Sequence, residues 1–141
     1  DMQNYGLKLA EKIEKDNKLY FAVDIDQEML DTIEKSANKK DIKNISTYSS
    51  IEQYLEISDN TKVDVIMSEV IEHIDLEESK LLVKTVIDKV NWNKIILSTP
   101  NKDFNVMYNF TDEDIRHDDH KFELTSIEFK NYVDELFSKY N

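Results

Sequence analysis

Two short stretches of the sequence contain the residue types that bind divalent metal ions. The first, Glu69-x-x-Glu72-His73, directly follows an apolar run at residues 63–67. In open α/β sheets ligands bind beyond the carboxyl ends of strands, so this stretch occupies a position suited to chemistry. If residues 69–73 are helical, the two carboxylates and the imidazole share one face. The alternative is a solvated acidic helix start, whose carboxylates are favoured by the helix dipole.

The second stretch runs from Arg116 to Glu123 and lies within a long polar segment, residues 101–124. Loops of this length in a compact domain are usually functional or disordered. The stretch contains His117 and His120, and the third histidine of the chain is His73. A lone loop histidine is most often a surface residue. The clustering of all three histidines with acids in two short segments nevertheless favours a metal site.

The candidate ligands are Glu69, Glu72, His73 and His120. They offer hard oxygens and borderline nitrogens, a set that suits Mg²⁺, Mn²⁺, Fe²⁺, Co²⁺ or Zn²⁺. A cation held in this way can act as a Lewis acid on substrate oxygens. A metal-dependent hydrolase that uses the same cluster without an organic cofactor is an open alternative.

Short apolar segments alternate with amphipathic ones along the chain, and the apolar segments lack the alternation of a half-exposed strand. This pattern predicts a mostly parallel sheet with helices on both faces. In the final helix, Thr125 and Glu128 form a capping box. Its apolar stripe comprises Phe129, Tyr132, Val133, Leu136, Phe137 and Tyr140. Strands are expected at 19–25, 44–48, 63–67 and 94–98, and helical segments at 7–15, after Asp26, at 51–55, from Asp75 to about Val90, near 112–115 and after Thr125.

The bulk composition is that of one globular domain. The chain has 141 residues, of which 40% are hydrophobic and 34% charged, and no cysteine. No apolar run approaches the roughly 18 residues of a membrane helix, and no signal-peptide pattern is present. We therefore expect a single domain over residues 1–141, no membrane partner, and a cytoplasmic location with the nucleus as the alternative.

An acid at the end of an early strand suggests a nucleoside site. Asp24 lies in the run Val23-Asp24-Ile25-Asp26, and an acid in that position accepts hydrogen bonds from ribose hydroxyls in nucleoside-binding α/β folds. Asp26 is explained equally well as a helix cap. A glycine-rich turn is expected before this strand, and the one candidate is the segment 1–6 with its single glycine, Gly6.

Several motifs together resemble the small-RNA 3′-terminal 2′-O-methyltransferases, which are HEN-type class I enzymes dependent on S-adenosylmethionine. The resemblance covers roughly residues 19–137. Its motifs are Ser68-Glu69-Val70-Ile71-Glu72-His73-Ile74, Ser98-Thr99-Pro100-Asn101 with Phe104-Asn105, and Arg116-His117-Asp118-Asp119-His120-Lys121-Phe122-Glu123.

The resemblance implies a Rossmann-like class I methyltransferase sheet with helices on both faces. It implies that Glu69, Glu72, His73 and His120 hold Mg²⁺ or Mn²⁺, which ligates the terminal ribose hydroxyls of an RNA 3′ end. Glu72, His73 and His120 are then catalytic, with a ligand histidine as the base. The expected cofactor-binding residues are Asp24, Ser50 and Ser68, and His117 is expected to line the site.

The sequence also departs from that family. The glycine-rich turn is reduced to Gly6, Leu124 replaces a tryptophan, and the first and last strands of the sheet are absent from these residues. The formal net charge of −12 is opposite to that of most RNA binders. We therefore expect a basic RNA-binding domain or partner protein to supply affinity. The alternative function is a catalytically degenerate subunit that serves as a partner-binding module.

Overall fold

The computed structural model describes residues 2–108, 111 and 115–140, without the side chains of residues 2–4. The helical turn expected near 112–115 therefore lies largely outside the described residues. The chain divides into two compact units, Asp1–Asp59 and Asn60–Asn141, which are treated separately below. None of the described helices is long and apolar enough to cross a membrane.

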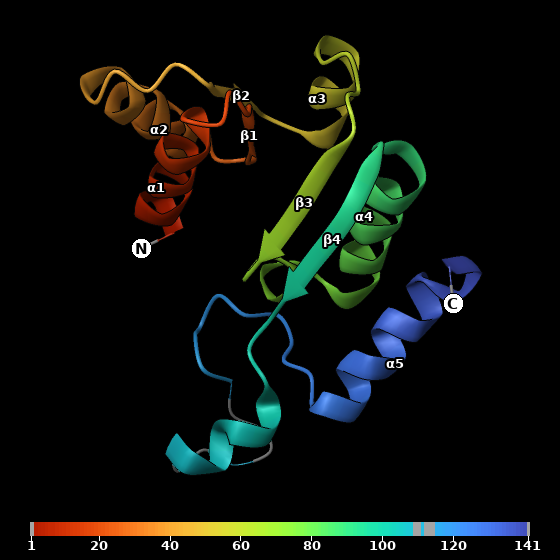
Figure 1. Cartoon of the computed structure of the whole chain (residues 1–141). Coiled ribbons are helices and arrows are strands. Elements are labelled where there is room, and N and C mark those ends of the chain that lie inside the picture. Colours follow the sequence, from red (N-terminus) through yellow and green to blue (C-terminus); the bar gives the residue numbers. More distant parts are fainter. Residues whose placement is uncertain (1, 109–110, 112–114, 141) are drawn as a thin grey trace. The chain divides into compact units, whose positions relative to one another are not determined.

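Unit 1 combines a pair of parallel strands with three helices (Figure 1). Strand β1 pairs with β2 in register from Tyr20↔Ile45 to Val23↔Tyr48. A small core of Leu7, Ala10, Ala37 and Ile42 is covered by Tyr20, Ile33 and Ile45. The elements are α1 (Met2–Glu14), β1 (Tyr20–Val23), α2 (Gln27–Lys39), β2 (Ile45–Tyr48) and α3 (Ile51–Ile57).

The single glycine contributes to packing in this unit. Gly6 lies within α1, so the expectation that residues 1–6 form a cofactor-cradling turn is wrong for the described residues. A Cβ built at Gly6 would lie 2.9 Å from Oη of Tyr20 on β1. Glycine therefore allows the helix to approach the Tyr20 hydroxyl closely.

Unit 2 contains the second parallel pair, β3 with β4 (Figure 1). Their register, Val65↔Ile95 through Ser68↔Ser98, brings the carboxyl ends of both strands to the same edge. Met67 is buried, whereas Ile66 and Ile96 of the opposite face are 54% and 49% exposed. The elements are β3 (Val63–Ser68), η1 (Ile71–His73), α4 (Leu76–Lys89), β4 (Trp92–Ser98), η2 (Lys102–Tyr108), α5 (Ser126–Leu136) and η3 (Ser138–Tyr140), where η denotes a 3₁₀ helix.

The capping box of α5 forms as the sequence predicts. The Thr125 side chain accepts a hydrogen bond from the Glu128 backbone N–H, and the Glu128 carboxylate accepts one from the Thr125 backbone N–H. The helix ends at Leu136, earlier than the apolar stripe suggests. Tyr140 lies in η3, with its ring centroid 5.2 Å from that of Trp92. Tyr140 thus belongs to a separate 3₁₀ helix, and the expectation that one helix carries the whole apolar stripe is wrong for this residue.

We expect Thr125→Ala to lower the free energy of unfolding by about 1 kcal/mol, because the alanine leaves helix N–H groups without a capping acceptor. Urea denaturation followed by circular dichroism measures the change. Thr125→Ser keeps the hydroxyl and is the matched control. Equal loss in both variants would contradict the capping role.

Candidate functional site

The turn after β3 sets up the first half of the site. Glu69 has φ 55°, and its backbone N–H donates to the Ser98 carbonyl at the end of β4. The short helix η1 then places Glu72 and His73. The premise that residues 69–73 form one helix is therefore wrong, because a left-handed residue cannot continue a right-handed helical turn.

A backbone hydrogen bond attaches the loop that contains His120 to the short helix that contains Glu72 and His73, and a second one shapes the loop itself. Lys121 N–H donates to the Glu72 carbonyl over 2.7 Å, and His120 N–H donates to the His117 carbonyl over 3.0 Å. The loop is thereby held against η1, although about fifty residues separate the two in sequence. The ring centroids of His73 and His120 lie 5.0 Å apart as a result.

Glu72, His73 and His120 form a group that could hold a metal ion. Each offers one ligand atom, and these atoms lie within 4.8 Å of one another. Ligand atoms about 2.1 Å from one ion lie at most about 4.2 Å apart. The three side chains would therefore have to rotate toward one another for joint coordination.

Glu72 has the clearest unsatisfied atom of the group. Its side chain is 0% exposed. Oε2 accepts a hydrogen bond from Thr99 Oγ1, whereas Oε1 is buried without a hydrogen-bond partner among the described residues. Burial raises the pKa of this carboxyl, and the Thr99 hydrogen bond only partly offsets the effect. Since a buried carboxylate oxygen without a partner is costly, the position suits a cation ligand.

A buried network fixes the His120 ring. His120 Nδ1 lies 2.8 Å from Glu123 Oε1, and both side chains are buried. Glu123 also accepts hydrogen bonds from Asn105 Nδ2 and from the Arg116 backbone N–H, each over 2.7 Å. Arg116 Nε donates in turn to Asn105 Oδ1. An ionised Glu123 selects the tautomer with hydrogen on Nδ1, which leaves the Nε2 lone pair available to a metal.

The charge state of Glu123 is consistent with that role. Burial alone raises its pKa, but the hydrogen bonds from Asn105 and Arg116 and the contact with His120 outweigh burial and leave the pKa below its ordinary value. Glu123 is therefore ionised at neutral pH. In the sequence, Glu123, Asn105 and Arg116 occur within the motifs quoted above, but no role was predicted for them. The i, i+3 spacing of His120 and Glu123 could have indicated that these two side chains interact.

His73 forms the open side of the group. Its side chain is 40% exposed, and Nδ1 lies 3.1 Å from Asp119 Oδ2. Nε2 lies 4.0 Å from Glu72 Oε1, so it faces the unpartnered oxygen. His117 is exposed, and its ring centroid lies 5.0 Å from that of His120. The predicted position of His117 beside the site agrees with this arrangement.

Glu69 lies outside the group of three. Its side chain is exposed, and it acts on Glu72 through its charge, which adds to the rise in the pKa of Glu72. The structure thus brings together three of the four predicted metal ligands. The assignment of Glu69 stays a prediction.

The three expected cofactor residues lie at or just beyond the carboxyl ends of β1, β2 and β3. In unit 1, Asp24 Oδ1 accepts a hydrogen bond from the Asp26 backbone N–H, and the Ser50 hydroxyl caps α3 by accepting from Gln53 N–H. In unit 2, the Ser68 and Ser98 hydroxyls lie 2.8 Å apart at the ends of β3 and β4. Each serine thus has a structural hydrogen bond, and the cofactor roles of Asp24, Ser50 and Ser68 stay predictions.

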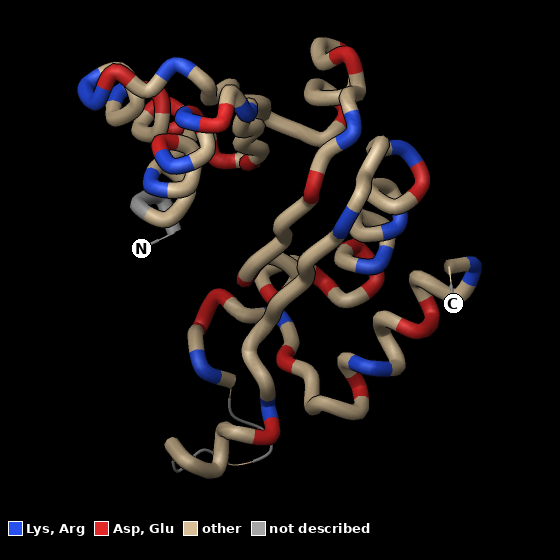
Figure 2. Tube along the Cα trace, in the orientation of Figure 1, with Lys and Arg blue, Asp and Glu red and all other residues tan. Residues whose placement is uncertain are grey.

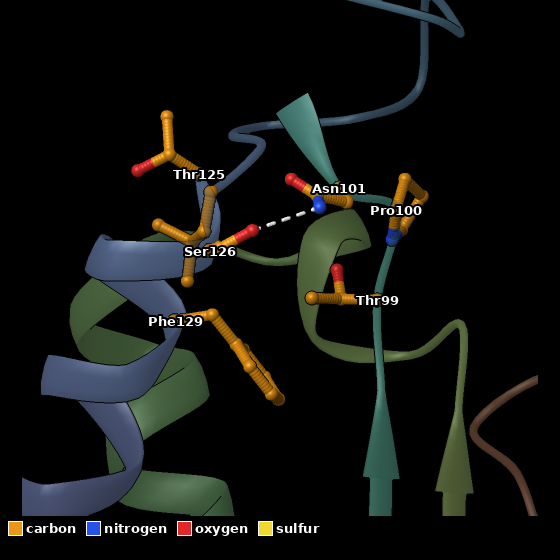
Figure 3. Close-up of a pocket in the computed structure, with 7 residues that line it drawn as sticks. Thr99, Pro100, Asn101, Thr125, Ser126 and Phe129 are labelled. Atoms are coloured by element: carbon orange, nitrogen blue, oxygen red, sulfur yellow. Dashed lines mark hydrogen bonds between the residues drawn. The ribbon is translucent and has the colours of Figure 1, made fainter. Parts of the chain in front are cut away.

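A small open pocket of about 170 Å³ lies between the end of β4 and the start of α5 (Figure 3). Asn101 Nδ2 donates to Ser126 Oγ across it. Thr99, on its wall, also donates to Glu72, so the pocket adjoins the candidate metal site. Its other lining residues are Pro100, Leu124, Thr125 and Phe129.

Comparison with known proteins places this geometry in context. No protein-family model matches the chain. The chain is 41% identical over 75 residues to the small RNA 2′-O-methyltransferase of Caenorhabditis elegans, a match that covers 52% of this chain and 17% of the relative. It is 29% identical over 101 residues to the protein of the same name from Tetrahymena thermophila, covering 70% of this chain and 24% of the relative.

Several solved structures also resemble the chain. A chain of the Pnkp1/Rnl/Hen1 RNA repair complex superposes with a TM-score of 0.71 at 27% identity, covering 94% of this chain and 29% of that one. The crystal structure of small RNA methyltransferase HEN1 gives a TM-score of 0.70 at 24% identity, covering 86% of this chain and 17% of that one. The latter similarity supports the fold alone.

The parallel strand pairs, the intervening helices and these superpositions define a Rossmann-like α/β fold, which is the fold class that the sequence predicts. The chain is, more particularly, a homologue of the proteins named small RNA 2′-O-methyltransferase, which confirms the resemblance. It spans less than a quarter of the length of the two relatives compared.

Proposed function

We propose that this chain is the catalytic part of a metal-dependent RNA methyltransferase. It transfers a methyl group from S-adenosylmethionine to the 2′-hydroxyl of the 3′-terminal nucleotide of a small RNA. The observation that carries the proposal is the buried, unpartnered Glu72 Oε1 beside His73 and His120. The names of the relatives supply the reaction class.

Glu72, His73 and His120 would hold Mg²⁺ or Mn²⁺, and the exposed Glu69 is proposed as a fourth ligand. The carboxylate oxygen that lacks a partner among the described residues suits either ion, and the two imidazoles favour Mn²⁺ over Mg²⁺. When bound, the cation would supply the positive charge that favours ionisation of a ribose hydroxyl.

The protein side chains have distinct tasks in this proposal. Glu123 holds the His120 tautomer, and Asp119 orients the His73 ring. A nitrogen bound to the metal has no lone pair left for a proton, so a histidine can serve as the base only while it is not a ligand. The half-exposed His73 is assigned this task in preference to the buried His120, because it can pass the proton to water. Asp24, Ser50 and Ser68 remain the proposed contacts for the cofactor.

RNA is the proposed partner, together with a basic domain or protein that offsets the charge of −12. One structural neighbour belongs to an RNA repair complex, which supports an assembly of this kind. The cis-diol of a terminal ribose distinguishes RNA from DNA, because DNA lacks the 2′-hydroxyl.

We expect single-stranded RNA with an intact 3′-terminal diol to accept a labelled methyl group from S-adenosylmethionine in the presence of Mn²⁺. The same RNA after periodate oxidation, or with a 2′-deoxy 3′ terminus, should give at least about 100-fold less product, because it lacks the acceptor hydroxyl. Scintillation counting of the recovered RNA measures the transfer. Equal labelling of the 2′-deoxy RNA would refute the proposed acceptor.

A non-catalytic, partner-binding role is the second candidate, and Gly6 is the observation that favours it. Gly6 packs against Tyr20, so the described residues contain no glycine-bearing turn to cradle a cofactor. Titration calorimetry separates the two candidates. Heat of binding with millimolar S-adenosylmethionine supports the enzyme, and the absence of binding supports the partner-binding subunit.

A further inference from the structure

The helix η2 presents an unusually apolar surface. Phe104, Val106, Met107 and Tyr108, which we call the apolar ridge, are 53%, 70%, 74% and 62% exposed. In Figure 2 the helix that follows the end of β4 is tan beyond its first residues, which means that it carries no Lys, Arg, Asp or Glu there, in a chain with 34% charged residues. Exposed apolar surface that is concentrated in this way usually marks an interaction site.

The ridge is tied to the candidate metal site. Asn105, in the same helix, is 3% exposed and donates to Glu123, the residue that holds His120. A substrate bound at the metal site would therefore approach η2. The ridge and the site belong to the same unit of the chain.

Arg116 adds a cation to the ridge. Its guanidinium carbon lies 5.3 Å from the centroid of the Tyr108 ring. Hydrogen bonds from Arg116 Nε to Asn105 Oδ1 and from its terminal nitrogen to the Asn101 carbonyl hold the guanidinium in place. The ridge thus combines two exposed rings with one positioned positive charge.

Resting on the proposed function, we propose that the apolar ridge binds the nucleobases next to the 3′ end of single-stranded RNA, with Phe104 and Tyr108 as stacking partners. Bases of single strands stack on aromatic side chains and on guanidinium planes, and this contribution depends little on sequence. A chain with a net charge of −12 gains little from general attraction to phosphates, so stacking is a source of affinity that this chain can supply by itself. The guanidinium of Arg116 complements the charge of the RNA and favours it over a purely apolar protein partner.

Fluorescence anisotropy with a 5′-labelled single-stranded RNA, in the absence of S-adenosylmethionine, tests the proposal on the full chain. Tyr108→Leu and Phe104→Leu keep apolar bulk and remove the ring, and each is expected to weaken binding about tenfold. Tyr108→Phe keeps the ring and should stay within about twofold of wild type. Ile127→Ala, on α5 with 74% exposure, is the control for loss of an exposed apolar side chain.

A second arm places an abasic nucleotide next to the 3′ end. If Tyr108 stacks on that base, the abasic RNA and Tyr108→Leu should not have additive effects. Wild-type affinity in both leucine variants would overturn the proposal and leave the ridge as a contact for protein. Absence of RNA binding by the wild-type chain would overturn it as well. Ring-dependent binding without methyl transfer would support the ridge and refute the proposed reaction, so the two failures are distinguishable.

Discussion

Glu72→Gln is expected to abolish methyl transfer while leaving the fold intact. The amide cannot supply the anionic Oε1 that faces His73, and the divalent ion loses its buried charged ligand. We expect at least about a 10³-fold loss of kcat/KM, corresponding to several kcal/mol of transition-state stabilisation. Transfer of labelled methyl groups to RNA in Mn²⁺ measures the activity, and titration calorimetry measures the affinity for Mn²⁺.

The same substitution should not destabilise the metal-free protein. Burial raises the pKa of Glu72, so ionised Glu72 costs the folded state free energy as the pH rises above the ordinary value for a carboxyl. Glutamine removes that charge and can still accept the hydrogen bond from Thr99. We expect the metal-free variant to melt at or above the wild-type temperature at pH 7. Glu78→Gln, the same change on the exposed surface of α4, is the control for both measurements.

Unchanged activity in Glu72→Gln would end the metal mechanism. A large fall in melting temperature without metal would instead make Glu72 a structural residue. The two measurements therefore separate a ligand from a fold determinant.

Glu123→Gln is expected to weaken Mn²⁺ binding and lower methyl transfer by about 10- to 100-fold, the usual effect of removing a partner that orients a histidine ligand. Glutamine can present its amide N–H to Nδ1 of His120, which favours hydrogen on Nε2 and so blocks the atom left for the metal. Glu123 acts as a positioning residue, because its carboxylate contacts His120, Asn105 and Arg116.

Two measurements on Glu123→Gln distinguish the loss of a residue that positions His120 from a loss of folded structure. Circular dichroism should show intact secondary structure in Glu123→Gln, and saturating Mn²⁺ should recover part of the activity. Asp134→Asn, an acid-to-amide change on exposed α5, provides the control. An unaltered affinity for Mn²⁺ in the Glu123 variant would contradict the tautomer argument.

Much of the fold was predictable because local signals coincide with the elements. Asp26 caps α2, Thr125 and Glu128 form the capping box of α5, and the short apolar runs become parallel strands. The extent of α1 and the end of α5 were not predicted. The close packing of Gly6 against Tyr20 and the ring contact of Tyr140 with Trp92 are tertiary features that the local sequence does not encode.

The grouping of three candidate ligands was predictable from the sequence, whereas their role as metal ligands stays a prediction. The clustered acids and histidines indicated Glu72, His73 and His120, whose ligand atoms lie within 4.8 Å of one another in the structure. The hydrogen-bond network that holds the His120 ring was not predictable. Asn105 and Arg116 contact Glu123 through a loop, and no sequence periodicity encodes the path of that loop. Glu69 was assigned by helical spacing, and the backbone does not have that spacing.

The backbone conformation at Glu69 has an energetic consequence. The positive-φ non-glycine residues described are Asn17, Asp41, Asn60 and Glu69. Asparagine and aspartate visit this region readily, whereas a longer side chain carries a conformational penalty that glycine or asparagine would relieve. The glutamate at position 69 therefore carries a cost in backbone free energy, at the edge of the sheet where the candidate ligands gather.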